Sequence, residues 1–539
     1  MRRSHAASCA ISSPADPFPR SLEVIPLPAL PRPDQLVDAV RHRALRLLGT
    51  DTAPGRAGRA ALRGLGGQSG QLRAEHAVIL HQLGQGRAPA LGELLAAVSA
   101  QLTAADAARE RGRESAAARH LDAALRLAFH QSVHYGPDGS PLMLRPEEFL
   151  APLRASAVAR AALFDEDAPR PPAPTLPPTS PKRPRRVLVL CASSWTFIDR
   201  VVADLREHTD VGLRVVDLST LPLAERPSHA LALRGREQWR RARRLLPVPA
   251  ALEEDLRWAD TVFVEWGSHT FAWLTFLDLA PFDVRVVARI HRYEILTPYP
   301  LLARCAALDE IAFVAPTVRE MLTSVSPRLA QARALRDLQN VHDLQPFVEA
   351  GEASTVRDPF RLLQIGWAPP IKDVEFSLAV IERLREVDPR FTLALVGHGP
   401  AADGPEAERA RALRERLAAL GDGVEELGFR TDVPALLAGA GFLLSSSRAE
   451  GTHESVAEAA AAGCVPVVRN WPEMAPWGGA SRIFPADWVV EDVEEAVQAV
   501  LALADPARRE QEAQRRRDLV LAERDPARIR AGYLALLGA

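Results

Sequence analysis

The chain has 539 residues, of which 47% are hydrophobic and 25% are charged, and its formal net charge is −2. At about 100 to 200 residues per domain, this length predicts three domains or so. The balanced charge excludes a global basic field of the kind that attracts nucleic acid, so we expect no nucleic-acid partner.

The lack of a recognisable targeting signal and the spacing of the cysteines favour a reducing compartment. The N-terminal stretch MRRSHAASCAISSPADPFPR is basic but has no apolar core of signal-peptide length, and no run reaches the roughly 18 apolar residues of a spanning helix. The four cysteines have no CxxC spacing, which favours free thiols: they are Cys9, Cys191, Cys305 and Cys464. We therefore expect a cytoplasmic protein.

The first 186 residues divide into three segments. Residues 1–33 hold several prolines and little periodicity, so we expect an irregular segment. Residues 34–166 place apolar side chains three and four positions apart, which predicts an all-helical domain of unknown role, interrupted by the turn cluster HYGPDGSP at 134–141. Residues 167–186 are dense in proline and predict a semi-rigid linker at a domain boundary.

After the linker, short aliphatic runs alternate with helix-length stretches, which is typical of doubly wound α/β domains. The runs predict strands at 187–192, 213–218, 261–266, 284–290 and 311–316, and then at 361–366, 391–397, 424–429, 441–447, 464–468 and 481–485. The two sets predict two Rossmann-like parallel-sheet domains, at 187–350 and 357–520. We expect a C-terminal helix at 521–539, and packing of this helix on the first Rossmann-like domain is one interpretation.

The stretch SSSRAEGTHESVAEAAAAGCVPVV, residues 445–468, has three glutamates spaced four residues apart, Glu450, Glu454 and Glu458. We expect Glu450 in the loop after a strand, Thr452 as the N-cap of the next helix, and Glu454 in the first turn, where the helix dipole favours an acid. Glu458 lies among alanines and four residues from a like charge, so it needs a partner. The hydroxyl groups of a bound ligand would serve as that partner, and a role without a ligand is equally open.

This segment resembles the E-x7-E motif of retaining, nucleotide-sugar-dependent glycosyltransferases of family 4. The resemblance extends in order through IGWAPPIKDVEFSLAVIERL at 365–384, LALVGHGP at 393–400 and LGFRTDVPALLAGAGFLLSSS at 427–447. RIHRYE at 290–295 and NVHDLQPF at 340–347 resemble family segments more loosely. The resemblance implies the GT-B fold, in which two Rossmann-like domains face a cleft.

The resemblance also implies roles for individual residues. Glu458 would bind the ribose of the nucleotide, Glu450 would face the donor sugar, and Lys372 would neutralise the diphosphate as the sugar leaves. His291, directly after a predicted strand, would lie beside the donor sugar. Lys372 is one of two lysines in a chain rich in arginine, and the other, Lys182, reads as a solvated charge of the linker.

The predicted catalytic residues are therefore Glu450, His291 and Lys372. The predicted nucleotide-sugar-binding residues are Glu458, Lys372, Gly366, Trp367, Gly397, Gly399, Arg430, Gly451, Thr452 and His453. Trp367 stands where many family members carry an arginine for the diphosphate, so Arg430 or Arg448 would have to replace that charge, while Trp367 either stacks on a ring or packs.

RGREQWRRARRLL, at 234–246, is arginine-rich and predicts a helix containing Trp239. Two interpretations are open: a solvated face, or an interfacial helix that makes peripheral contact with an anionic membrane at its inner face.

We expect a retaining glycosyltransferase that moves a sugar from a nucleoside-diphosphate sugar to an unidentified glycan, lipid-linked or small-molecule acceptor. No acidic DxD motif follows a strand, so we expect no metal ion and no cofactor beyond the donor. A nucleotide-sugar epimerase of the same architecture and a non-catalytic nucleotide-sugar-binding protein are the alternatives. A dehydrogenase is disfavoured because no strand is followed by G-x-G-x-x-G.

Overall fold

The structure, a computed structural model, describes residues 90–539 apart from 137, 168–170, 181, 193–194 and 404–405. The predicted irregular segment at 1–33 and the helices expected before residue 90 lie outside the described residues. The described part of the N-terminal region is helical as predicted: α4 (Leu91–Glu110), α5 (Glu114–Ala128), α6 (Gln131–His134), α7 (Pro141–Leu144), α8 (Pro146–Ala155) and α9 (Ala157–Leu163).

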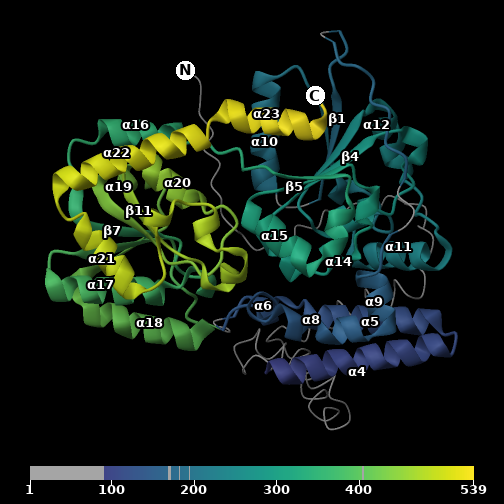
Figure 1. The fold of residues 1–539 in the computed structure, drawn as a ribbon, viewed down its shortest axis with the longest axis horizontal. Coiled ribbons are helices and arrows are strands. Elements are labelled where there is room, and N and C mark those ends of the chain that lie inside the picture. The colour runs from purple at the N-terminus through teal and green to yellow at the C-terminus, as the bar shows by residue number, and fades with distance from the viewer. Residues whose placement is uncertain (1–89, 137, 168–170, 181, 193–194, 404–405) are drawn as a thin grey trace, which may run out of the picture. The chain divides into compact units, whose positions relative to one another are not determined.

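The first sheet has six parallel strands in the order β2-β1-β3-β4-β5-β6 (Figure 1). They are β1 (Arg186–Cys191), β2 (Gly212–Asp217), β3 (Thr261–Glu265), β4 (Arg285–Ile290), β5 (Glu310–Phe313) and β6 (Ala334–Asp337). Their helices are α10 (Trp195–His208), α11 (His229–Ala242), α12 (Glu253–Trp258), α13 (His269–Leu274), α14 (Tyr299–Leu302) and α15 (Pro316–Val325). Strand β6 was not predicted, because this edge strand is short and contains no fully buried residue.

The second sheet is also parallel and six-stranded, in the order β12-β11-β10-β7-β8-β9. Its strands are β7 (Asp358–Ile365), β8 (Thr392–Val396), β9 (Val424–Gly428), β10 (Ala440–Ser445), β11 (Val465–Arg469) and β12 (Val489–Val490). Its helices are α16 (Gln345–Ala353), α17 (Val374–Val387), α18 (Ala407–Leu420), α19 (Val433–Gly439), α20 (Glu454–Ala461), α21 (Val493–Ala502) and α22 (Pro506–Glu523). Two doubly wound parallel-sheet domains after a helical region confirm the predicted GT-B fold class.

One predicted strand is wrong. Residues 481–485 contain part of a 3-10 turn, Ala480–Arg482, and the sixth strand is the two-residue β12 further along the chain. The short apolar run turns instead of extending because Ser481 and Arg482 are exposed, while Phe484 is buried against Trp488.

The last helix, α23 (Pro526–Leu537), packs on the first sheet. The hydroxyl of Thr261 donates a hydrogen bond to the carbonyl of Leu537 at 2.8 Å, and Tyr533 is buried in the same core as Val187 and Val189. The chain thus ends on the domain that its first strands build.

The proline-rich segment packs on the first sheet domain at both of its ends. Asp167 is buried between Arg236, at 2.5 Å, and Arg328, at 3.4 Å. Arg183 pairs with Asp260 at 2.8 Å, and Arg185 donates to the carbonyl of Gly538 at 2.7 Å. The expected spacer is therefore anchored to the fold, and Lys182 is exposed as expected.

Helix α11 contains much of the arginine-rich stretch, and its apolar side is buried. Trp239 is 5% exposed and lies under the guanidinium of Arg304, at 3.9 Å from the ring centroid. An interfacial helix inserts an apolar face into lipid, so Trp239 is not placed for that insertion, and membrane contact through the exposed arginines stays a prediction. None of the described helices has the length and apolar character needed to cross a membrane.

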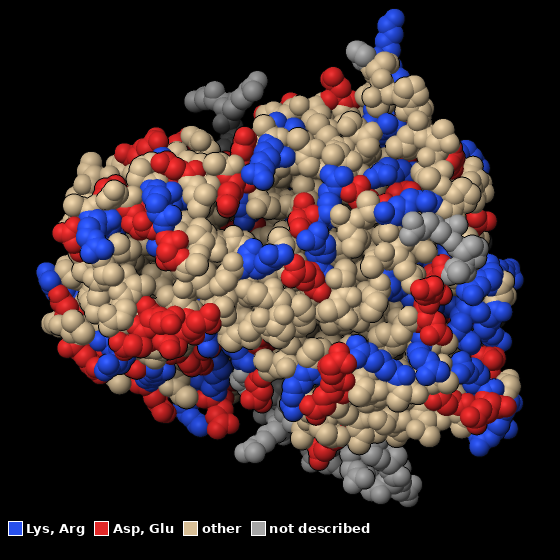
Figure 2. Space-filling model, viewed as in Figure 1, with Lys and Arg blue, Asp and Glu red and all other residues tan. Residues whose placement is uncertain are grey.

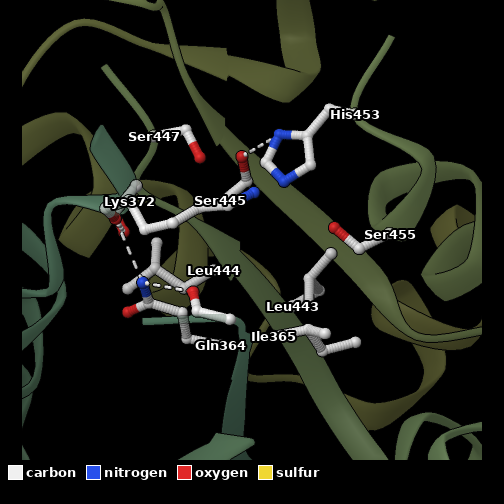
Figure 3. A pocket seen from close by; sticks show the side chains of 11 residues that line it. Gln364, Ile365, Lys372, Leu443, Leu444, Ser445, Ser447, His453 and Ser455 are labelled. Carbon is white, nitrogen blue, oxygen red and sulfur yellow. Dashed lines mark hydrogen bonds between the residues drawn. The ribbon is translucent and has the colours of Figure 1, made fainter. Parts of the chain in front are cut away.

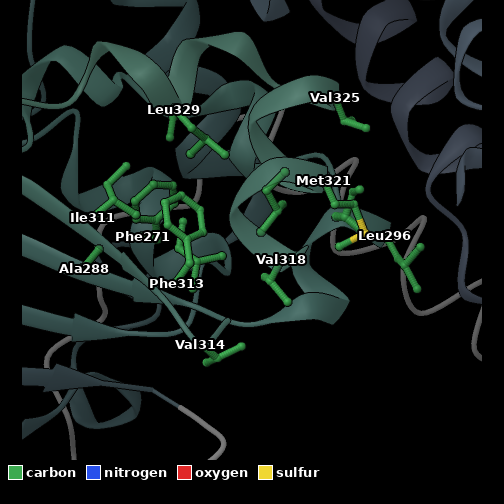
Figure 4. Close-up of a cluster of buried hydrophobic side chains, with 14 of the residues drawn as sticks. Phe271, Ala288, Leu296, Ile311, Phe313, Val314, Val318, Met321, Val325 and Leu329 are labelled. Carbon is green, nitrogen blue, oxygen red and sulfur yellow. The ribbon is translucent and has the colours of Figure 1, made fainter. Parts of the chain in front are cut away.

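The core and the surface both fit the composition. Aromatic and aliphatic side chains of α13, β5 and α15, including Phe271, Phe313 and Met321, pack together against the first sheet (Figure 4). Figure 2 shows acidic and basic side chains interspersed over the visible face, as the balanced net charge leads us to expect.

Candidate functional site

The candidate site lies at the carboxyl ends of β7 and β10, the two neighbouring strands at which the order of the second sheet reverses. Ligands of doubly wound sheets bind in the crevice at such a switch point. A pocket there is lined from several elements (Figure 3): by Gln364, Ile365, Gly366, Lys372, Leu443, Leu444, Ser445, Ser446, Ser447, His453 and Ser455.

Lys372 and Glu450 form the central ion pair of the site. Lys372 ends the 3-10 turn Pro370–Lys372 after β7, and its Nζ lies 2.6 Å from Oε1 of Glu450 in the loop after β10. The hydroxyl of Ser447 donates to the same carboxylate oxygen at 2.8 Å, and that of Ser446 donates to the carbonyl of Lys372 at 2.6 Å. Side-chain and backbone bonds thus hold the two loops together.

The surrounding charges fix the ionisation of the pair. Burial alone would raise the pKa of Glu450, but Lys372 and, more weakly, His453 and Arg292 outweigh burial and hold this pKa well below its usual range. Burial lowers the pKa of His453 to about 4 against the opposing effect of Glu450, so its imidazole is neutral near pH 7. The site therefore presents one carboxylate, one ammonium and one neutral imidazole.

The helix after this loop begins differently from the prediction. Helix α20 starts at Glu454, and the residue before it is His453 in a left-handed conformation with φ of +50°. Thr452 is not the N-cap; its hydroxyl donates to Oε1 of Glu454 at 2.6 Å. His453 and Ser445 point toward each other, with Nδ1 and Oγ 3.0 Å apart (Figure 3).

Glu458 has a protein partner that the sequence did not identify. Nε2 of His342 lies 2.9 Å from Oε1 of Glu458, and Nδ1 of the same ring accepts a hydrogen bond from Arg200 at 2.8 Å. Since Arg200 lies on α10 and His342 follows β6, residues of the first sheet domain reach the predicted ribose-binding carboxylate.

Glu454 does more than complement the helix dipole. It accepts hydrogen bonds from Asn340 at 2.7 Å and from Arg524 at 3.2 Å. Burial acts to raise its pKa, but Arg524 and His342, together with the hydrogen bonds from Thr452 and Asn340, outweigh burial and lower the pKa. The dipole interpretation was thus incomplete, because the carboxylate is held by groups far away in the sequence.

His291 belongs to a buried polar cluster after β4. Its Nε2 lies 2.6 Å from Oε1 of Glu265, which also accepts from Arg289 at 2.5 Å, and the ring stacks on Trp266 with 3.9 Å between centroids. Burial lowers the pKa of His291 to about 4 although Glu265 opposes it. The imidazole is therefore neutral near pH 7, and because a carboxylate only accepts, Nε2 carries the proton.

A chain of hydrogen bonds joins this cluster to α20. Arg289 donates to Oδ1 of Asn340 at 2.5 Å, and Nδ2 of Asn340 donates to Thr452 at 3.0 Å as well as to Glu454. Sequence reasoning missed Glu265, Arg289 and Asn340. The available signal was the presence of Glu265 and Arg289 inside the otherwise apolar strands TVFVE and RVVARI.

Glycines let the loops after β7 and β8 approach closely. Gly366 and Gly397 have φ of +72° and +112°, and a Cβ added to Gly397 would lie 3.6 Å from the Cα of Gly366. Trp367 is 3% exposed, donates its indole N–H to the carbonyl of Gly397 at 3.0 Å and lies against Gly399. Of the two interpretations of Trp367, the structure supports the second, because the indole packs against the loop after β8.

Each of the remaining predicted residues has protein contacts of its own. Arg430 is exposed and pairs with Asp432 at 2.5 Å, and Arg448 pairs with Glu473 at 2.9 Å. Gly451 lies between the two sheet domains, where an added Cβ would be 3.7 Å from Cβ of Arg292. Arg292, in the loosely similar segment RIHRYE, is thus a cation beside the site that the sequence reasoning did not select. Over the described part of the chain, no group of three or more His, Cys, Asp or Glu is arranged to hold a metal ion.

Comparison with known proteins supports a glycosyltransferase. Residues 359–505 match the family model described as "Glycosyl transferases group 1", a span that runs from β7 through α21. No curated protein matches the chain.

Solved structures also match the chain at low identity. HepE of Anabaena, in complex with UDP and glucose, is 13% identical, covers 66% of this chain and 99% of its own, and has a TM-score of 0.48. A mutant O-GlcNAc transferase of Thermobaculum terrenum is 16% identical over 94% of this chain and 98% of its own, with a TM-score of 0.44. The trehalose-6-phosphate synthase OtsA is 12% identical over 66% and 99%, with a TM-score of 0.45.

Proposed function

We propose that this chain is a retaining glycosyltransferase that moves a sugar from a nucleoside-diphosphate sugar to an acceptor still to be identified. The observation that carries the proposal is the pair of Lys372 and Glu450 at the switch point of a domain that matches group 1 glycosyl transferases. No metal ion or further cofactor is part of the proposal.

The diphosphate of the donor would bind beside the pocket at the start of α20. The free backbone N–H groups of a helix N-terminus attract phosphate, and Lys372 adds a full positive charge on the opposite wall. The ribose would bind at Glu458, whose Oε1 already contacts His342, by donating a hydroxyl hydrogen to Oε2. Lys372 and Glu458 thus mark the two ends of the nucleotide site.

The ion pair would separate during the reaction. As the bond between the anomeric carbon and the diphosphate oxygen breaks, negative charge develops on the diphosphate and positive charge on the sugar. Lys372 would turn from Glu450 toward the diphosphate, which leaves the Glu450 carboxylate to face the sugar. The acceptor hydroxyl then bonds to the anomeric carbon on the same face, and its proton leaves with the diphosphate.

His291 would contact the donor sugar as a neutral group. Because Glu265 holds the proton on Nε2, Nδ1 is a hydrogen-bond acceptor at neutral pH. A sugar hydroxyl could donate to it without adding a second cation beside the developing positive charge. The burial of His291, which keeps its imidazole uncharged, therefore avoids repulsion between this residue and the sugar as positive charge develops.

The experiment is a melting-temperature panel with UDP-, GDP- and ADP-glucose, followed by assay of nucleoside-diphosphate release with the sugar that binds. A ligand specific for the folded state raises its melting temperature. We expect one nucleotide to shift the wild-type protein and Glu450→Gln to retain the shift while losing turnover. Turnover without nucleoside-diphosphate release would indicate the epimerase, and unchanged cellular function of Glu450→Gln would indicate the binding protein.

A further inference from the structure

A turn of the helical region lies on the second sheet domain close to the candidate site. The backbone N–H of Ser140 donates to Oε2 of Glu473 at 3.2 Å. Gly139 has φ of +78°, and a Cβ added to it would overlap Arg448 and lie 2.6 Å from Oε1 of Glu473. The backbone of this turn therefore rests directly on the ion pair of Arg448 and Glu473.

The turn is held in shape by its own buried histidine. Nδ1 of His134 lies 2.8 Å from the hydroxyl of Ser140, and Nε2 lies 2.9 Å from the carbonyl of Ala128. A carbonyl only accepts, so Nε2 carries the proton and Nδ1 accepts from Ser140. The side chain of Ser140 is thereby occupied within the turn, and its backbone N–H is left to point at Glu473.

The ion pair under the turn is bonded to both loops of the candidate site. The N–H of Arg448 donates to the carbonyl of Ile371 at 2.8 Å, and that of Glu473 donates to the carbonyl of Arg448 at 3.0 Å. Ile371 immediately precedes Lys372, and Arg448 stands two residues before Glu450. A shift of Arg448 would therefore move the backbones that carry the ammonium and the carboxylate.

The same segment also touches the first sheet domain. Nη1 of Arg292 lies 3.9 Å from the sulfur of Met143, which belongs to α7 directly after the turn. Arg292 follows His291 and lies beside Gly451. Ser140 and Met143 thus contact segments next to the site in both sheet domains.

We propose that the segment from Gly139 to Leu144 is a positioning element of the donor site, which acts through Glu473 and Arg448 on the pair of Lys372 and Glu450. The inference rests on the proposed function and adds to it a role for the helical region. It makes that region a required part of the transferase rather than an independent neighbour.

The test compares Ser140→Pro with Ser140→Ala in the full chain. Both remove the hydroxyl, but only proline removes the N–H that binds Glu473, and the φ of −80° at Ser140 is one that proline can adopt. The assay uses whichever of UDP-, GDP- and ADP-glucose shifts the wild-type melting temperature, and follows nucleoside-diphosphate release. We expect kcat of Ser140→Pro to be about tenfold or more below that of Ser140→Ala, with KM for the donor within about threefold, since a hydrogen bond to a charged group is lost.

A double-mutant cycle separates positioning from general stability. If Ser140 acts through Glu473, Ser140→Pro should change kcat by less than about threefold in a Glu473→Gln background. Full additivity, or equal kcat for Ser140→Pro and Ser140→Ala, would overturn the inference. Should Ser140→Pro not fold, Gly139→Ala, which pushes a methyl group into Arg448, is measured instead and must show the same fall in kcat. A wild-type protein that binds none of the three donors would overturn the proposed function itself. A wild-type enzyme that turns over, but whose kcat is the same in the Ser140→Pro and Ser140→Ala variants, would overturn only the inference about the turn.

Discussion

The two sheets of this chain keep their charged groups in different places. In the second sheet domain, Lys372 and Glu450 lie in loops after strands, and their side chains are 25% and 16% exposed. In the first, Glu265 and Arg289 lie within β3 and β4, and both are 0% exposed. A partly exposed pair can be hydrated as it separates, whereas breaking a fully buried pair leaves an uncompensated charge. We therefore propose that the charges of the second sheet domain exchange partners when a ligand binds, whereas those of the first hold fixed positions.

Arg289→Met is the change with the largest expected effect on folding. It leaves Glu265 buried without its cation, which costs about 3 to 5 kcal/mol in the free energy of unfolding. Denaturant titration measures the loss. Lys372→Met is the matched comparison: its partner Glu450 is 16% exposed and can be hydrated or take up a proton, so the loss should be smaller than that of Arg289→Met. Equal losses for the two variants would break the comparison between the sheets.

Glu450→Gln should have the reverse profile, with a large loss of rate and little loss of stability. Removing a group aimed at developing charge lowers kcat by about 100- to 1000-fold. Steady-state release of nucleoside diphosphate measures the rate, and a thermal melt of the same sample measures the fold. If Glu450→Gln keeps the wild-type kcat but has a lower melting temperature, Glu450 has a structural role like that of Glu265 and Arg289 in the first sheet.

Acid should destabilise all parts of the described fold in a similar way. Burial lowers the pKa of His134, His291 and His453 from 6.5 to about 4 in each case. The unfolded chain then takes up protons first, so stability is full above pH 6.5 and falls as the pH drops toward 4, by up to about 3 kcal/mol per histidine. The free energy of unfolding, measured from pH 7 to 4, should depend less steeply on pH in His291→Gln than in the wild-type protein, by the slope that one proton contributes.

The fold was largely predictable, because most of the strands contain aliphatic runs that are typical of a buried parallel sheet. The exceptions are β6 and β12, an edge strand without buried residues and a strand of two residues, in which periodicity gives no signal. The meeting of Lys372 and Glu450 could be expected from their positions after strands. The pairing of Glu265 with Arg289 could not, because it depends on β3 and β4 being neighbours in register. The partners of Glu458 and Glu454 could not be predicted either, because they are far away in the sequence and meet these residues only in the folded chain.

The smallest expected effect concerns His342, where the first sheet domain meets the predicted ribose site. His342→Ala removes the hydrogen bond between His342 and Glu458 that orients this carboxylate, so we expect the affinity for the nucleoside diphosphate to fall by about 3- to 10-fold. Titration calorimetry with UDP, GDP and ADP measures the dissociation constants, and Gln345→Ala, an exposed change three residues away, is the control. A gain in affinity would mean that His342 competes with the ribose for Glu458. The first sheet domain would then oppose nucleotide binding, and its role would no longer be fixed positioning alone.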